Sequence, residues 1–440
     1  MFYEEFRFKI FLKIKILINF EDLNFIKILK NIYLWIMADI TRHNHLRSLE
    51  QLQDKKLIKV ITGVRRCGKS TLMLQFQELI RNKNSEAPII SLNMDVPEYR
   101  FIAESGWKGV YDFIEKALVK DKKNYVFLDE VQNVAEFEKL LEGLFVHPDV
   151  DLYVTGSNAY LLSSELATLL TGRAFEISLL PFSFAEYLEA RADAPEPGKA
   201  FNDYLYTGGF PDAVNLAAVG ANYAYQYLQT VFENIYQNDI LKRHQINSVT
   251  AYREVVNFLT DSVGSIVSAR NIANTLQSGG RKTDNKTVAK YIDTLVESYL
   301  FYKASRFDIK GKQHMATQEK YYLVDTGLRG ALLGKELDTD YGHLLENVVY
   351  LELLRRGNKV WVGKIGTKET DFVTLTSDGY TRYYQVAYSV SDPKTLEREI
   401  APFNLIKDHN EKILLTMDYQ TGSRNGIKQI NVVDWLLGRE

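Results

Sequence analysis

A glycine-rich run between two apolar segments constrains this chain more than any other feature. Residues 63–71 read Gly-Val-Arg-Arg-Cys-Gly-Lys-Ser-Thr and follow the apolar run 57–62. Gly63 and Gly68 permit backbone angles and close approaches that a Cβ would block. If a helix begins at Lys69, successive backbone N–H groups converge at its N-terminus and form an anion-binding nest. The pattern therefore predicts a buried strand, a phosphate-binding loop and a helix, in that order.

Several side chains in this run have defined tasks when the ligand is ATP. The Lys69 ammonium would reach the β- and γ-phosphates, and the Ser70 hydroxyl would bind Mg²⁺. Cys67, the one cysteine of the chain, also lies in the loop. Either the helix dipole favours its thiolate, or it is a small side chain that fills a permissive position. The predicted cofactors are ATP and Mg²⁺, and the predicted nucleotide contacts are Gly63, Arg65, Arg66, Cys67, Gly68, Lys69, Ser70 and Thr71.

Two adjacent carboxylates follow a second apolar run. Residues 125–128 read Tyr-Val-Phe-Leu and lead directly into Asp129 and Glu130. Ligands of open α/β sheets bind at the carboxyl ends of the strands, where such acids would lie. We expect Asp129 to hold Mg²⁺ and Glu130 to orient and deprotonate the attacking water. The competing interpretation is that these are two solvated acids at a strand end. It is less well supported here because the same chain contains a phosphate-binding loop.

Two further residues are candidates for contact with the γ-phosphate. A third apolar run, 151–155, leads into Gly-Ser-Asn, and we expect Asn158 to position the attacking water, with Ser157 and Thr155 as neighbours that share the task. The alternative for Asn158 is a helix cap. Arg173 would stabilise the charge of the transition state, in its own subunit or a neighbouring one. The alternative for Arg173 is a surface ion pair.

Apolar runs alternate with helical segments from residue 57 to about residue 177, which predicts an α/β fold with a doubly wound parallel sheet of the P-loop NTPase type. Beyond it, residues 268–276 and a helix from Lys286 frame a turn and precede another apolar run, as in a winged helix. The predicted units are an atypical N-terminal extension (1–36), the P-loop core (37–215), a helical, winged-helix-like lid (216–312) and a C-terminal α/β unit (313–440).

The composition limits the classes of partner and compartment. The net charge of −2 argues against binding of polyanions by the whole protein. Segment 268–290 is nevertheless locally basic and is a candidate contact for double-stranded DNA, the alternative being a lid or protein-contact module with a solvated face. The apolar run 10–20 is interrupted by lysines and is too short to span a bilayer. We expect a cytoplasmic protein without membrane contact, whose working start is Met37.

The C-terminal unit contains acids at spacings typical of a nuclease. A helical Glu346, then Asp371 on one strand and Gln385 on the next, can converge on one metal ion. The position where a nuclease has its lysine is Ala387 here, which removes a cation from the reacting centre. Lys364 or Lys368 would have to replace it, so we expect no nuclease activity.

The order of these motifs resembles that of a known group. The P-loop, Leu-Asp-Glu, Thr-Gly-Ser-Asn, Gly-Arg, Pro-Phe-Ser-Phe and Gly-Gly-Phe-Pro occur in sequence before the terminal block. From about residue 40 to 440 the chain is similar to prokaryotic AAA-type ATPases that end in a restriction-endonuclease-like, PD-(D/E)xK domain of unknown function. The resemblance implies nucleotide binding at Lys69, hydrolysis at Glu130, and γ-phosphate sensing by Asn158 and Arg173.

These features predict an ATPase in which hydrolysis rearranges the lid and the C-terminal unit. Two alternatives remain open at this stage. One is a slow ATP-dependent switch that recruits a protein partner or a second copy of the chain. The other is an ATP-regulated DNA-binding protein or nuclease.

Overall fold

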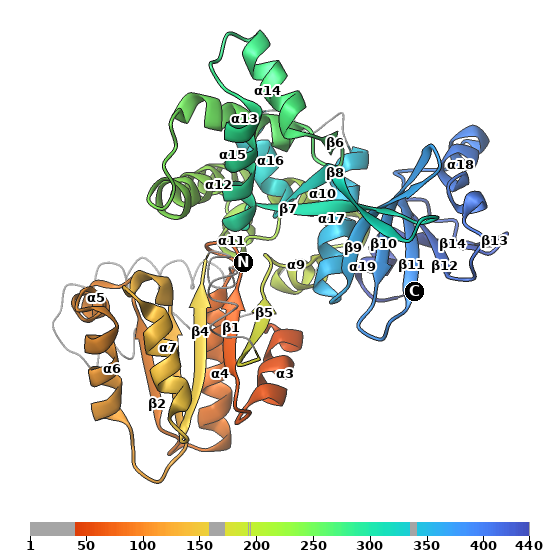
Figure 1. The fold of residues 1–440 in the computed structure, drawn as a ribbon. Helices are drawn as coiled ribbons and strands as arrows, with labels where there is room; N and C mark the ends of the chain where they lie inside the picture. Colours follow the sequence, from red (N-terminus) through yellow and green to blue (C-terminus); the bar gives the residue numbers. More distant parts are fainter. Residues whose placement is uncertain (1–39, 158–171, 192, 194, 335–340, 440) are drawn as a thin grey trace.

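The computed structural model describes residues 40–157, 172–191, 193, 195–334 and 341–439. Figure 1 shows three parts: a five-stranded sheet with its helices, a group of helices above it, and a second sheet beside that group. None of the helices in these ranges combines the length and apolar character needed to cross a membrane.

The first sheet is parallel throughout, with strand order β2-β3-β4-β1-β5. Strand β4 therefore separates β1, which precedes the glycine-rich loop, from β3, which ends in the two acids. The three apolar runs predicted at 57–62, 125–128 and 151–155 agree with β1, β3 and β4 to within one residue at each end. The strands of this sheet are β1 (Ile58–Thr62), β2 (Ile89–Asn93), β3 (Asn124–Asp129), β4 (Val150–Gly156) and β5 (Ala174–Ser178).

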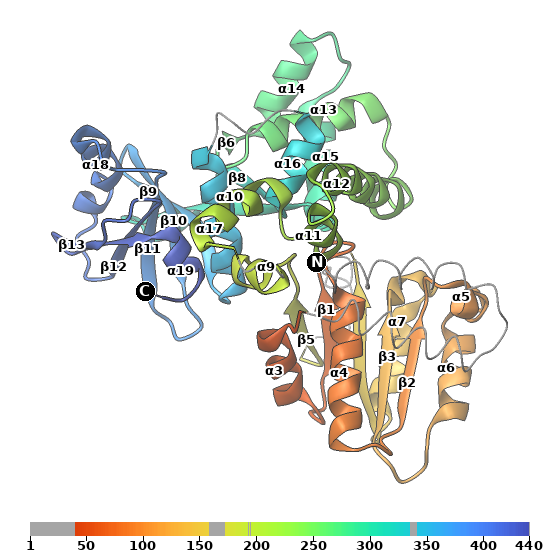
Figure 2. The same cartoon turned by 180° about the vertical axis from the view of Figure 1, so that it is seen from behind.

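Helices cover both faces of this sheet, as Figures 1 and 2 show from opposite sides. Along β3, Phe127 packs in the cluster that contains α4, while Val126 and Leu128 pack in the cluster that contains α7. Burial of both faces explains the apolar runs in the sequence, and the predicted doubly wound sheet is confirmed. The helices are α3 (His43–Leu52), α4 (Lys69–Lys83), α5 (Pro97–Glu104), α6 (Gly106–Ala117) and α7 (Phe137–Val146), with a short turn at Val131–Asn133.

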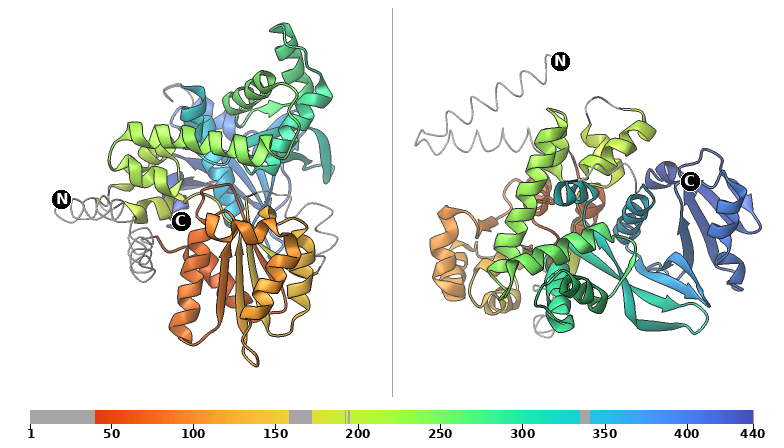
Figure 3. Two further views of the ribbon diagram at one scale, coloured as in Figure 1. Left: turned by 90° about the vertical axis from the view of Figure 1, so that its left-hand side faces the viewer. Right: turned by 90° about the horizontal axis from the view of Figure 1, so that it is seen from above.

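The second part is mainly helical, as expected. In Figure 3 the long green helix α12 lies across the top of the first sheet. Ser183 begins α9 with a capping box to Glu186, and Ser268 caps α14 by accepting from the Asn271 N–H, because hydroxyls satisfy the free N–H groups of a first turn. The helices are α9 (Phe184–Ala190), α10 (Pro197–Thr207), α11 (Pro211–Ala217), α12 (Ala221–Ile235), the π-helix η3 (Tyr236–Leu241), α13 (Val249–Asp261), α14 (Ala269–Ser278), α15 (Asn285–Glu297) and α16 (Thr326–Leu333).

The third part is built on a mixed sheet of nine strands in the order β13-β14-β12-β11-β10-β9-β7-β8-β6. The predicted boundary at 312 falls inside the β7–β8 hairpin, because β7 pairs with both β8 and β9. The strands are β6 (Ile266–Val267), β7 (Phe301–Asp308), β8 (Gln313–Leu323), β9 (Lys359–Ile365), β10 (Lys368–Leu375), β11 (Thr381–Val386), β12 (Glu411–Thr416), β13 (Gly422–Arg424) and β14 (Ile427–Asn431). The accompanying helices are α17 (Tyr341–Arg355), α18 (Pro393–Ile400), the short η4 (Phe403–Leu405) and α19 (Val432–Leu436).

A buried carboxyl group joins the turn after α10 to α16. Asp325 accepts hydrogen bonds from the Gly209 N–H at 2.6 Å and from the Leu328 N–H at 3.3 Å. Gly208 has a φ of +72°, and a Cβ there would lie 1.9 Å from Asp325 Oδ1. Burial raises the pKa of Asp325 from 3.8 to about 6, although its hydrogen bonds to backbone N–H groups oppose this shift.

The raised pKa of Asp325 predicts a pH dependence of stability. The folded state favours the protonated carboxyl. The contribution of Asp325 to the stability of the fold is therefore complete below about pH 4 and is lost as the pH rises through about 6. The rise in the pKa from 3.8 to about 6 corresponds to a loss of about 3 kcal/mol in the free energy of unfolding. We expect Asp325→Asn to remove this part of the slope in unfolding experiments between pH 4 and 7.

Asp392→Asn is the matched control for that experiment. Asp392 also begins a helix and accepts a first-turn N–H, from Thr395. Its pKa is lowered, mainly by that hydrogen bond, so its contribution disappears only at more acidic pH. Equal slopes for wild type and Asp325→Asn would contradict the assignment.

Candidate nucleotide-binding site

The loop between β1 and α4 has a backbone that two glycines make possible. Gly63 has a φ of +146°, and a Cβ there would lie 2.1 Å from the carbonyl oxygen of Leu179. Gly68 has a φ of +104° and immediately precedes the first residue of α4. Side chains at either position would be strained or excluded. The loop therefore adopts the predicted compact turn at a helix N-terminus.

Lys69 folds back over this loop. Its ammonium donates to the carbonyl oxygens of Gly63 at 3.0 Å and Val64 at 3.2 Å. It lies 3.9 Å from Glu130 Oε1, and its side chain is 3% exposed. A buried ammonium with two carbonyl acceptors and one carboxylate is well placed to bind an oxyanion at the mouth of the loop.

Asp129 is a buried carboxylate whose direct partners in the described chain are neutral. It accepts from Asn93 Nδ2 at 2.7 Å and from the hydroxyls of Thr155 and Ser70. Burial and the neighbouring charge of Glu130 raise its pKa. Such a carboxylate beside a serine hydroxyl fits Mg²⁺, which prefers oxygen ligands. No group of three His, Cys, Asp or Glu side chains within the described ranges could hold a metal alone, so phosphate oxygens would complete the shell.

Glu130 differs from its neighbour in geometry and charge. Its φ of +53° is rare for a residue with a side chain, and such strain occurs often at functional sites. Burial alone would raise its pKa, but the cations of Lys69 and Arg65, together with hydrogen bonds from two neighbouring side chains, outweigh burial and lower it. Ser157 Oγ lies 3.2 Å from its Oε2. Glu130 is therefore an ionised acceptor beside the lysine, as a base for water must be.

The end of β4 supplies two of the predicted polar residues. The Thr155 hydroxyl accepts from the Glu130 N–H at 3.0 Å and donates to Asp129, so one side chain holds both acids in place. Ser157 is buried beside Glu130. Asn158 lies outside the described residues, and its role stays a prediction.

Arg173 is not part of this site within one chain. It precedes β5, and the pairing of Ala174 with Ile58 places it at the start of β1, whereas the loop lies at the other end. Five strand residues span about 16 Å, which exceeds the reach of an arginine side chain. Arg173 is exposed and lies over the Phe145 ring at 5.7 Å. The predicted contact with its own subunit's γ-phosphate is wrong, and a role in a neighbouring subunit stays a prediction.

The remaining loop residues have different environments. Arg65 is half-buried and bonds to Asp239, whereas Arg66 is exposed with a φ of +71°. The Cys67 thiol is fully buried, and burial raises its pKa. Of the two interpretations that the sequence left open, the favoured thiolate is therefore contradicted, because desolvation outweighs the nearby positive charges. Cys67 instead fills space behind the loop.

Sequence reasoning missed two residues at this site. Arg42 donates to the Cys67 carbonyl at 2.9 Å and pairs with Glu186 at 2.7 Å, which ties the loop to α9. Asp239 reaches the loop from η3. Neither stands in a recognisable motif, and Asp239 follows Arg65 by 174 positions. The signal that joins them exists only in three dimensions.

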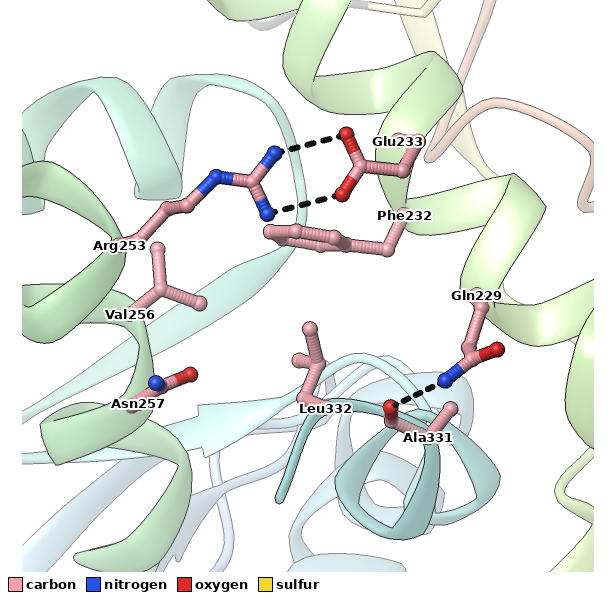
Figure 4. Close-up of a pocket in the computed structure, with 8 residues that line it drawn as sticks. All are labelled: Gln229, Phe232, Glu233, Arg253, Val256, Asn257, Ala331 and Leu332. Atoms are coloured by element: carbon pink, nitrogen blue, oxygen red, sulfur yellow. Dashed lines mark hydrogen bonds and ion pairs between the residues drawn. The ribbon is translucent and has the colours of Figure 1, made fainter. Parts of the chain in front are cut away.

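A cavity of about 340 Å³ lies at the mouth of the loop. Its lining includes Arg42, Arg65, Arg66, Gly68, Lys69, Ser70, Thr71, Asn93 and Glu130. A larger cavity of about 390 Å³ lies between α12, α13 and α16 (Figure 4). There the two charged side chains, Arg253 and Glu233, bond to each other, so both charges of that cavity are already paired.

The C-terminal acids converge, but around a lysine. Lys320 Nζ, from β8, lies 3.0 Å from Glu346, 3.0 Å from Glu369 and 3.8 Å from Asp371. Burial lowers the pKa of Lys320, but these acids outweigh burial and raise it. Gln385 instead donates to Glu399 at 3.0 Å. Lys320 belongs to none of the predicted motifs, although it stands at the start of the apolar run 321–324.

The fold and this site define the N-terminal part as a domain of the P-loop NTPase fold, and comparison with known proteins agrees. Residues 55–188 match the AAA domain family, and residues 198–339 match a domain of unknown function (DUF8612). An uncharacterized protein of Haemophilus influenzae is 39% identical over 411 residues, which cover 91% of this chain and 99% of that protein. The chain belongs to the family of this protein.

More distant proteins are also similar. The uncharacterized protein MJ1544 of Methanocaldococcus jannaschii is 28% identical over 80% of this chain and 79% of its own length. The solved Walker-type ATPase PABY2304 of Pyrococcus abyssi has a TM-score of 0.44 and 15% identity, over 67% of this chain and 95% of that chain. Cdc6p of Pyrobaculum aerophilum has a TM-score of 0.31 and 12% identity, over 70% of this chain and 94% of that chain.

Proposed function

We propose that this protein binds ATP with Mg²⁺, hydrolyses it, and uses hydrolysis to rearrange its helical and C-terminal parts. The observation that carries the proposal is the meeting of Lys69 and Glu130 at one cavity. Asp129 accepts hydrogen bonds from two residues that line the same cavity, Ser70 and Asn93. Lys69 begins α4 after the loop that follows β1, and the two acids stand at the end of β3. Together they provide a cation for phosphate, an acceptor for metal and an ionised base. The AAA domain match supports the same chemistry.

Each residue has one task in this proposal. The loop N–H groups and Lys69 bind the phosphates, and Ser70 and Asp129 would hold Mg²⁺, which neutralises phosphate charge when bound. Glu130 accepts the proton of the attacking water, and Thr155 fixes its position through the Glu130 N–H. Asn158 is retained as a candidate for orienting that water.

Calorimetric titration of the full chain with ATP in magnesium buffer, together with phosphate release, tests the proposal. Binding followed by release of phosphate is the expected result. The absence of any nucleotide uptake by the folded protein would refute it.

The C-terminal part is proposed as a nuclease-like unit without cleavage activity. Lys320 supplies a positive charge among Glu346, Glu369 and Asp371, the place where a nuclease would bind its metal. A plasmid-nicking assay with Mg²⁺ or Mn²⁺ should therefore show no product. Nicking that disappears in Glu346→Gln would contradict this assignment.

Binding of double-stranded DNA is a second candidate function that one observation favours. Helix α14, a turn, α15 and the β7–β8 hairpin follow in order, and β6 pairs with β8, as in a winged helix. Arg281 is held by Glu254 at 2.6 Å. Arg270, Lys282, Lys286 and Lys290 are exposed and have no ion pair among the described residues.

We expect duplex binding to weaken with salt, and Lys286→Ala/Lys290→Ala to lower its salt slope by about 2, because each lysine would neutralise one phosphate. Fluorescence anisotropy at several salt concentrations measures both effects. Lys394→Ala/Lys407→Ala removes two exposed lysines from the C-terminal part and should leave the slope unchanged. Binding that does not depend on salt would exclude this function.

A further inference from the structure

The π-helix η3 places a buried carboxylate inside the ATPase site. Asp239 is 1% exposed, and its oxygens accept from Arg65 Nε at 2.9 Å and Nη2 at 3.2 Å. Arg243, also from the helical part, lies 3.9 Å away. Single π-helical turns are rare and occur often at functional sites, because the extra residue redirects a side chain. Here the turn continues α12 and directs Asp239 toward the loop.

A serine hydroxyl links this carboxylate to the proposed base. Ser157 Oγ lies 3.0 Å from Asp239 Oδ1 and 3.2 Å from Glu130 Oε2. A hydroxyl has one proton to donate, and both carboxylates only accept. The orientation of Ser157, and with it the hydrogen bonding of Glu130, therefore depends on whether Asp239 is in place.

Arg65 provides a second link between Asp239 and Glu130, and this link is electrostatic. Its positive charge acts on Glu130, while Asp239 holds the guanidinium in place through two hydrogen bonds. The planar guanidinium prefers such a bidentate partner. Without Asp239, Arg65 keeps its ion pair with the exposed Asp95 at 3.6 Å, but it can turn toward Glu130, the other buried carboxylate near it.

We infer that Asp239 is a positioning residue of the ATPase site, supplied by the helical part, that holds Arg65 and Ser157 so that Glu130 can act on water. This inference rests on the proposed ATP hydrolysis. It adds that turnover requires η3 to be seated on the loop. The helical part thus contributes to catalysis directly, and its displacement by a partner would stop hydrolysis without blocking the phosphate site.

The test replaces the carboxylate with an amide of the same shape. Asp239→Asn should lower kcat per bound nucleotide about 10- to 100-fold, because a small misplacement of a catalytic group has effects of that size. KM for ATP should stay within about threefold, because Lys69 and the loop N–H groups still bind the phosphates. A merely structural role would reduce the fraction of folded protein, not kcat per site. Asp239→Glu, which restores the charge, should recover part of the rate.

Glu233→Gln is the matched control. Glu233 lies in α12 shortly before η3 and, like Asp239, holds an arginine through two bonds, to Arg253 at 2.9 Å each. This pair lines the cavity between α12, α13 and α16 (Figure 4) and not the cavity at the loop. Its loss should leave kcat within about twofold of wild type. An equal fall in both variants would show general loosening of the helical part and overturn the inference.

A double-mutant cycle with Arg65 tests whether Arg65 and Asp239 act through one interaction. Arg65→Lys keeps the charge but loses the bidentate geometry. If both residues act through one interaction, Arg65→Lys/Asp239→Asn should be no slower than the slower single variant, to within about twofold. Losses that multiply would overturn the inference. If Asp239→Asn fails to fold, Arg65→Lys alone must show the fall in kcat. Wild-type protein that neither binds nor hydrolyses ATP would refute the proposed function instead.

Discussion

Replacing Lys69 with alanine is expected to lower ATP affinity at least about 100-fold, or about 2.7 kcal/mol. The ammonium is buried at the mouth of the loop, and no second lysine of the described chain forms part of the cavity lining. Charge-assisted hydrogen bonds to two phosphates would disappear together, each with a net contribution of about 1.5–3 kcal/mol. Calorimetric titration with ATP in magnesium buffer measures the change.

Lys83→Ala serves as the control for this variant. Lys83 is on the same helix, α4, in its last turn, and it pairs with Glu50 at 2.9 Å on the surface. Its removal takes one positive charge from the same helix without touching the loop. Affinity should then equal that of wild type. Wild-type affinity in Lys69→Ala would instead remove the loop from nucleotide binding.

Glu130→Gln is expected to bind ATP normally but to lower turnover by about 10²- to 10⁴-fold, the usual range for a lost general base. The amide keeps the size of the side chain and its contact with Ser157, but it has no basic oxygen with the affinity of a carboxylate for a proton. Nucleotide binding and phosphate release must be measured on the same preparation, so that the two effects are separated.

Another glutamate with a positive φ serves as the matched control for Glu130→Gln. Glu136 also has a positive φ, +55°, but it is exposed and pairs with Lys139. Glu136→Gln should therefore retain wild-type turnover. Normal hydrolysis in Glu130→Gln would eliminate this residue from the mechanism. Very slow hydrolysis in wild type, with tight binding, would favour the ATP-dependent switch.

Much of the first sheet could be predicted because its signals are local. The run from 125 to 128 is apolar because β3 is buried on both faces. The residue pattern of this one strand is therefore enough to indicate that it lies inside the sheet. The capping box from Ser183 to Glu186 is likewise a contact within one helical turn. Such features depend on a few consecutive residues, and the structure reproduces them.

Local sequence was misleading or ambiguous where strand direction or burial decided the outcome. Arg173 stands in a suggestive Gly-Arg pair, but the parallel pairing of β5 with β1 carries it to the opposite edge of the sheet. Cys67 has the helix N-terminus that lowers a thiol pKa, but its complete burial raises that pKa. Both properties depend on neighbours that lie more than one hundred positions away or on the packing of the whole core.

In the C-terminal part, too, some contacts could be predicted from the sequence and others depended on tertiary packing. The sequence suggested that Glu346 and Asp371 meet, and the structure brings them together. It did not suggest that Lys320 lies between them, because β8 reaches that position through the long β7–β8 hairpin. A cation supplied by a distant strand changes the chemistry of the same two acids.

By itself, the amino-acid sequence determined the phosphate loop, the strands around it and the two acids, since glycine geometry, apolar runs and helix caps act over a few residues. Only the tertiary structure decided that Asp239 completes this site, that Lys320 lies among the C-terminal acids and that Arg173 lies at the far edge of the sheet. The reason is physical: ion pairs and burial depend on distances in space, and these are set only when separate elements pack together.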